Sequence, residues 1–152
     1  MTNIKELLEE IVVDYTESDM ITITVKKINL KKTLKLLKET QDLEFTQLID
    51  LCAVDYIDYG KSEWETRETT STGYNRGITP QSHSRVDSIS EQNELDYQLC
   101  VVYHLLSLKL NQRVRVKCFL EDNSLIIPSV TDIYPASDWY EREAYDLYGI
   151  LF

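Results

Sequence analysis

The chain has 152 residues, which suits one domain with a single hydrophobic core. Its net charge of −10 argues against nucleic-acid binding, because contact with phosphates requires clustered Lys and Arg. No apolar run approaches the roughly 18–20 residues of a membrane-spanning helix and the first residues lack the order of a signal peptide, so we expect a soluble, unexported protein with no direct membrane span.

The N-terminal residues predict a helix followed by a β-hairpin. Residues 3–11 carry apolar side chains at helical spacing, and Asn3 with Glu6 resembles a capping box. Residues 12–16 have the composition of a strand. Residues 20–26 alternate apolar and polar side chains, which indicates the antiparallel partner of that strand.

The middle of the chain predicts a helix, a strand and a polar insertion. Asn29 is the expected N-cap of the helix, whose apolar stripe consists of Leu30, Leu34 and Leu37. Residues 49–57 form an apolar run typical of a strand. Residues 60–96 are rich in Ser and Thr and poor in large apolar side chains, so we expect a long, poorly ordered insertion within one domain.

Two further strands are predicted after the insertion. Residues 97–108 are apolar on both faces, which indicates a strand in the interior of a sheet. Residues 113–121 alternate, with apolar side chains inward and a basic strip outward. In an acidic chain this strip has two interpretations, a solvated strand face or a surface that binds an acidic partner. The basic strip consists of Arg113, Arg115 and Lys117.

The last helix is predicted to begin at Ser137 or Asp138, with Asp138 and Glu141 in capping-box spacing, and to end at Gly149. Its expected buried face consists of Tyr140, Ala144, Leu147 and Leu151. The whole pattern predicts a single α+β domain over residues 1–152, built as two layers with a mixed sheet of about five strands in the order α-β-β-α-β-β-β-α.

The same helix holds the densest cluster of ionisable residues. Glu141 and Glu143 lie about 200° apart around a helix, which argues against a hydrolase with paired carboxylates. Arg142 is expected to pair with Asp146 at i,i+4. Glu143 and Asp146 share a face with Trp139, and an aromatic side chain beside charges favours an interface.

No other residues suggest a catalytic or cofactor site. The cysteines Cys52, Cys100 and Cys118 are far apart in sequence, so we expect buried thiols in a reducing compartment. His104 falls within a predicted strand, where a structural role is expected, and His83 has no cluster of ligands near it. The sequence has no nucleophile–base pattern and no ligand set for iron–sulfur, flavin or zinc.

Residues 139–150 read Trp-Tyr-Glu-Arg-Glu-Ala-Tyr-Asp-Leu-Tyr-Gly-Ile. They resemble the signature of the C subunit of the respiratory NADH:quinone oxidoreductase, the thirty-kilodalton subunit family of complex I. Residues 52–56, 101–107 and 113–116 are also similar to that family. The signature positions in this sequence are Trp139, Glu141, Arg142, Glu143, Asp146 and Gly149.

The resemblance implies a non-catalytic subunit in the peripheral arm of a proton-translocating NADH:quinone oxidoreductase. It implies no cofactor on this chain, with FMN, iron–sulfur clusters and quinone held by partner subunits. The implied location is the cytoplasmic side of the bacterial inner membrane, reached through the iron–sulfur and quinone-site subunits. Family members continue beyond Gly-Ile-x-Phe, whereas this sequence stops at Phe152, so a C-terminally shortened form is expected.

The sequence is also compatible with two other functions. The equivalent subunit of a membrane-bound hydrogenase or formate hydrogenlyase shares this ancestry. A standalone protein-binding module would use the basic strip to bind an acidic partner.

Overall fold

The structure is a computed structural model and describes residues 4–8, 11–17, 20–56, 99–120 and 124–152, the side chain of Glu6 excepted. The predicted insertion and Asn3 lie outside these residues. The described elements are α1 (Ile4–Leu8), β1 (Val12–Glu17), β2 (Ile21–Val25), the 3-10 turn η1 (Lys27–Asn29), α2 (Leu30–Glu39), β3 (Gln47–Asp55), β4 (Leu99–Ser107), β5 (Gln112–Phe119) and α3 (Ser137–Tyr148). Over the described residues, the α+β class and the mixed sheet of five strands agree with the prediction.

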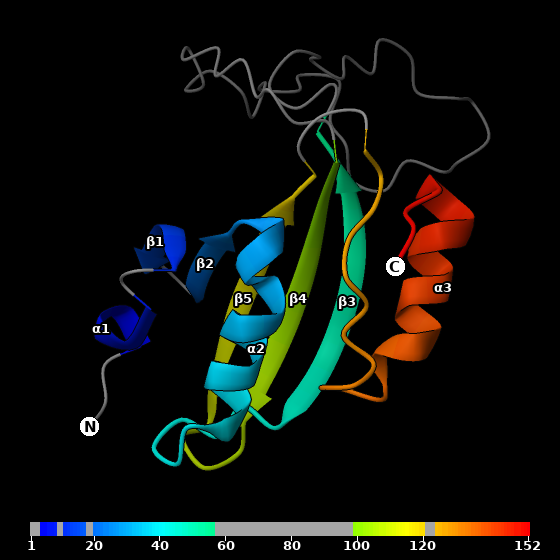
Figure 1. Ribbon diagram of the computed structural model, residues 1–152. Helices are drawn as coiled ribbons and strands as arrows, with labels where there is room; N and C mark the ends of the chain where they lie inside the picture. Colours follow the sequence, from blue (N-terminus) through cyan, green and yellow to red (C-terminus); the bar gives the residue numbers. More distant parts are fainter. Residues whose placement is uncertain (1–3, 9–10, 18–19, 57–98, 121–123) are drawn as a thin grey trace, which may run out of the picture.

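The five strands form one mixed sheet in the order β1-β2-β5-β4-β3. Of the four pairs between these described strands, β2–β5 is parallel and the other three are antiparallel. Strand β4 lies between β5 and β3, which confirms its predicted interior place. Helix α2 covers one face of the sheet, whereas α3 lies beyond β3 at the edge of the sheet (Figure 1).

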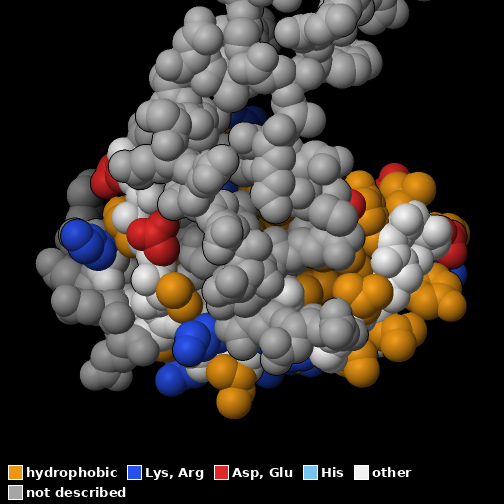
Figure 2. Space-filling view, turned by 90° about the horizontal axis from the view of Figure 1, so that it is seen from above, with side chains coloured by type: hydrophobic (Ala, Val, Ile, Leu, Met, Phe, Trp, Pro, Cys, Tyr) orange, Lys and Arg blue, Asp and Glu red, His pale blue; other side chains and the backbone are white. Residues whose placement is uncertain are grey.

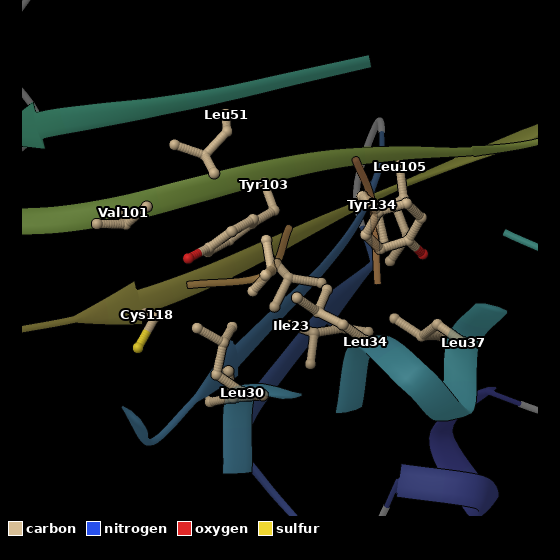
Figure 3. Packing of buried hydrophobic residues seen from close by; sticks show 14 of the residues in the cluster. Ile23, Leu30, Leu34, Leu37, Leu51, Val101, Tyr103, Leu105, Cys118 and Tyr134 are labelled. Carbon is tan, nitrogen blue, oxygen red and sulfur yellow. The ribbon is translucent and has the colours of Figure 1, made fainter. Parts of the chain in front are cut away.

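The core lies between the sheet and α2. Ile23, Val116, Tyr103 and Leu51 are neighbours in register across β2, β5, β4 and β3, so their side chains leave the same face of the sheet. All four are at most 1% exposed. The predicted stripe of α2 faces this row (Figure 3) and is fully buried; it consists of Leu30, Leu34 and Leu37.

Helix α2 does not cover the other face of the sheet, which we call the outer sheet face. Thr22, Arg115, His104 and Asp50 form one row across this face, in the same four-strand register. A second row consists of Thr24, Lys117, Val102 and Cys52. The outer sheet face therefore carries two of the three residues of the basic strip beside an acidic residue and a histidine.

Asn29 occupies the predicted N-cap position of α2, but its side chain makes no capping hydrogen bond. Asn29 ends the η1 turn and already has a helical backbone (φ −96°, ψ −9°), whereas a capping residue is extended. Its side-chain amide instead donates a hydrogen bond of 3.3 Å to the carbonyl oxygen of Ile11. Asn29 therefore ties the start of α2 to the turn before β1.

The segment between β5 and α3 is fastened to α2 and to the chain before β3. The Lys31 ammonium pairs with Asp132 at 2.9 Å. The Lys38 ammonium donates to the carbonyl of Ile133 and lies over the ring of Tyr134. The Tyr134 hydroxyl donates to the carbonyl of Phe45 at 2.7 Å. These contacts fix the segment from which α3 begins.

Candidate interaction surfaces

Glu141 connects α3 to the segment before it. The side chain is 6% exposed. Its carboxylate accepts hydrogen bonds from the Val130 amide at 2.8 Å, the Ser129 hydroxyl at 2.7 Å and the Ser137 hydroxyl at 3.1 Å. A buried carboxylate is stable only when it is paired in this way. Glu141 thus has an internal role, and its side chain is not part of an exposed surface.

The predicted capping box of α3 is therefore wrong. The helix begins at Ser137 as expected, but Ala136 occupies the N-cap and makes no side-chain cap bond. Glu141 cannot complete a box with Asp138 because Asp138 is already the second residue of the helix and does not occupy its N-cap. Ser137 lies four residues before Glu141, so the spacing in the sequence indicates this contact. The spacing gives no such indication for Ser129 and Val130, and their contacts with Glu141 were not predicted.

The outer side of α3 is charged and aromatic. Glu143 and Asp146 are exposed, and Trp139 is 75% exposed. Arg142 pairs with Asp138 at 3.0 Å, which corrects the expected pair with Asp146. Both acids lie four residues from Arg142, but an acid on the N-terminal side of its base suits the helix dipole better. Glu143, Asp146 and Trp139 thus lie together on the exposed side, as the sequence predicted.

The buried stripe of α3 is narrower than predicted. Ala144 is buried and Tyr140 is half-buried, but Leu147 is 68% exposed, and Leu151, which is 51% exposed, lies beyond the end of the helix. The reason is the position of the helix, which packs against the edge strand β3 rather than across a face of the sheet. Gly149 ends α3 in the left-handed conformation (φ +71°), as predicted.

The basic strip is partly engaged within the chain. Arg113 is exposed, whereas Arg115 and Lys117 are half-buried. The Arg115 guanidinium donates from Nε to His104 Nε2 at 3.0 Å, and His104 Nδ1 lies 3.8 Å from a carboxylate oxygen of Asp50. Burial lowers the pKa of His104, Arg115 lowers it further and Asp50 opposes them. His104 therefore favours its neutral form, with Nε2 as an acceptor.

All three cysteines are thiols and take no part in a disulfide. Cys100 and Cys118 are buried, and burial raises the pKa of Cys100 to about 12. Cys52 is half-buried on the outer sheet face; burial, then the charges of Asp50 and Glu143, raise its pKa. These environments disfavour a reactive thiolate.

Within the described ranges, no three His, Cys, Asp or Glu side chains are grouped so that they could hold a metal ion. Of the helices described, none is long and apolar enough to cross a membrane.

The chain is an α+β domain with a five-stranded mixed sheet. Two solved structures share this fold. A trypsin-resistant fragment of Nqo5 matches it with a TM-score of 0.61, over 97% of this chain and 93% of the fragment. A chain of the membrane-bound sulfane sulfur reductase, an archaeal respiratory membrane complex, matches with a TM-score of 0.63, over 98% of this chain and 67% of that one. Both are 20% identical in sequence, so these likenesses concern the fold alone.

Sequence comparison gives the family. The family described as "Respiratory-chain NADH dehydrogenase, 30 Kd subunit" matches residues 23–152, and this chain belongs to it. The C subunit of the NADH-quinone oxidoreductase of Legionella pneumophila (strain Paris) is 44% identical over 132 residues, which are 87% of this chain and 56% of the relative. The corresponding C subunit of Coxiella burnetii (strain Dugway 5J108-111) is 40% identical over 88% of this chain and 57% of its own length. The chain thus spans little more than half the length of these relatives.

Proposed function

We propose that the chain is a non-catalytic peripheral-arm subunit of a proton-translocating NADH:quinone oxidoreductase. The observation that carries this proposal is the identity of 40–44% with C subunits of NADH-quinone oxidoreductases, over 87–88% of the chain. Those relatives are longer, so their activity is extended to this chain as a proposal. The described structure supports a scaffolding role through residues that hold α3 in place and present its outer side.

Among the residues that the structure describes, the ionisable side chains of α3 and the outer sheet face are separated or already engaged. Glu141 is buried and accepts three hydrogen bonds, whereas Glu143 and Asp146 are exposed. His104 accepts a hydrogen bond from Arg115. In the proposed function, FMN, iron–sulfur clusters and quinone are therefore held by partner subunits, and this chain positions those subunits for electron transfer from NADH to quinone.

We propose two contact surfaces for those partners, the iron–sulfur and quinone-site subunits. One is the outer side of α3, with Trp139, Glu143 and Asp146. The other is the basic strip, of which Arg113 is the most exposed member on β5. Through these contacts the chain is peripheral to the cytoplasmic side of the bacterial inner membrane.

Affinity purification and gene deletion test the proposed function. The natural gene product, tagged in the cells that encode it, should co-purify with NADH:quinone oxidoreductase activity. Deleting the gene should remove the assembled enzyme from native gels and its activity from membranes, and a plasmid copy should restore both. Normal assembly and activity in the deletion strain would contradict the proposal.

A further inference from the structure

The outer side of α3 combines large apolar side chains with acidic ones. Trp139 is 75% exposed and Leu147 is 68% exposed. Hydrophobic side chains gather on the α3 side of the molecule in the space-filling view (Figure 2). A single exposed apolar residue needs no explanation, but a tryptophan and a leucine two turns apart on one helix indicate a surface that a partner covers.

The charge of this surface is negative and uncompensated. Helix α3 contains four acidic residues and one basic residue. Glu141 is turned inward and Asp138 pairs with Arg142. Glu143 and Asp146 are exposed and form no ion pair within the part of the chain that the structure describes. Within the described ranges, two carboxylates therefore lie beside the apolar side chains without a cation paired to them.

Trp139 already has a contact on α3 before any partner binds. The Arg142 guanidinium lies 5.3 Å from the centre of its ring and is oriented by the ion pair with Asp138. An aromatic side chain that is already ordered loses little conformational entropy on binding. This arrangement favours Trp139 as the anchor of an interface.

The charges select the kind of partner. A second copy of this chain, bound through the same surface, would place Glu143 and Asp146 opposite like charges. Anionic lipids and nucleic acids would be repelled in the same way. A polypeptide with Lys or Arg beside apolar side chains matches both features of the surface.

We propose that the outer side of α3 binds a basic amphipathic segment of another subunit. In this complex the apolar side chains of the segment cover Trp139 and Leu147, and its Lys or Arg side chains pair with Glu143 and Asp146. This inference rests on the proposed function and deepens it by giving the chemistry of the partner.

A photo-crosslinking amino acid can identify the bound segment. p-Benzoylphenylalanine replaces Leu147 in the natural gene product, which keeps Trp139 intact. The matched control replaces Ile28, which is 86% exposed on η1 at the start of α2. After irradiation in cells, the oxidoreductase is purified and the crosslinked peptide is sequenced by mass spectrometry. We expect a crosslink from position 147 to a peptide with Lys or Arg within about one helical turn of apolar residues, and none to that peptide from position 28.

Charge reversal tests the pairing. The double variant Glu143→Lys/Asp146→Lys should lower the crosslink yield from position 147 at least about tenfold, which corresponds to about 1.4 kcal/mol. The control variant Glu39→Lys makes the same kind of change at an exposed acid on α2 and should leave the yield unchanged.

The outcomes separate this inference from the proposed function. A chain that co-purifies with the oxidoreductase but crosslinks to an acidic or uncharged segment, or to nothing, overturns the inference and leaves the proposed function standing. A crosslink to a basic segment of a protein outside that enzyme keeps the chemistry of the surface and overturns the proposed function. A chain without any associated protein contradicts both.

Discussion

The Nε2 atom of His104 accepts a hydrogen bond of 3.0 Å from Nε of Arg115 across strands β4 and β5. Protonation of Nε2 would break this bond and place two cations side by side. Burial and Arg115 accordingly lower the pKa of His104, against the opposing charge of Asp50. The neutral ring is thus part of the folded structure of the outer sheet face.

This relationship predicts how stability depends on pH. Because the pKa of His104 is lowered on folding, the unfolded chain takes up the proton first as the pH falls below about 6.5. The stabilising contribution is complete above that pH and is lost as the pH falls toward the lower pKa of the folded chain. Urea unfolding of the isolated chain between about pH 7.5 and pH 5.5 should show this loss, and His104→Gln should reduce it.

The chain has one other histidine, His83, which provides the control. His83→Gln should leave the slope of stability against pH as it is in the parent chain. Equal slopes for the parent and His104→Gln would show that the Arg115 contact does not set the titration of His104.

Replacing Glu141 should destabilise the domain. Glu141→Ala leaves the amide of Val130 and the hydroxyls of Ser129 and Ser137 without their acceptor. Each buried unsatisfied donor costs about 1–3 kcal/mol, so we expect the free energy of unfolding to fall by about 2–4 kcal/mol. Urea denaturation measures this loss, and Glu143→Ala, an exposed acid two residues away, should change it by less than about 0.5 kcal/mol. Equal effects of the two substitutions would rule out the internal role of Glu141.

Two buried tyrosines should respond differently to loss of their hydroxyl groups. The Tyr103 hydroxyl is buried and has no hydrogen-bond partner in the described part of the chain, whereas Tyr134 donates to the carbonyl of Phe45 at 2.7 Å. Tyr103→Phe should therefore keep or raise the free energy of unfolding, and Tyr134→Phe should lower it by about 1 kcal/mol. Differential scanning calorimetry of both variants checks the ranking. The reverse ranking would indicate that Tyr103 has a partner.

The contact proposed for α3 predicts assembly defects without unfolding. Trp139→Ala removes an exposed anchor, so the melting temperature of the isolated chain should stay close to that of the parent. A residue at the centre of an interface often contributes about 2 kcal/mol or more to binding, equal to a roughly 30-fold loss of affinity. In cells with the natural gene, the amount of assembled oxidoreductase on native gels and the NADH:quinone activity of membranes should fall.

The single variants Glu143→Ala and Asp146→Ala should act in the same direction as Trp139→Ala, again with an unchanged melting temperature. If any of these three substitutions unfolds the isolated chain, the substituted residue stabilises the domain itself and is not a contact for a partner. Normal assembly with all three would exclude α3 as a contact surface.

Alternation of apolar and polar residues predicted β2 and β5, because a strand with one buried face must alternate. Strands β3 and β4 were predicted instead from apolar runs, and a strand that is buried on both faces does not alternate. The side-chain roles around α3 were less predictable. Glu141 has the sequence signature of a capping residue, yet its partners Ser129 and Val130 come from the irregular segment before α3, which only the tertiary structure brings near. Leu147 was expected in the core because periodicity gives the direction of a side chain but not the width of the surface that covers it.

The position of α3 beside β3 also matters for the chain during synthesis. Ile49 lies at an irregularity of the β3–β4 register, and its carbonyl accepts a hydrogen bond of 3.1 Å from the Tyr140 hydroxyl. An edge strand without such cover offers its free backbone groups to other chains. Since α3 follows all five described strands in the sequence, a nascent chain on the ribosome has an open β3 edge until α3 emerges. During that interval the β3 edge can pair with the edge strand of another chain, and a chaperone that shields strands would prevent this aggregation.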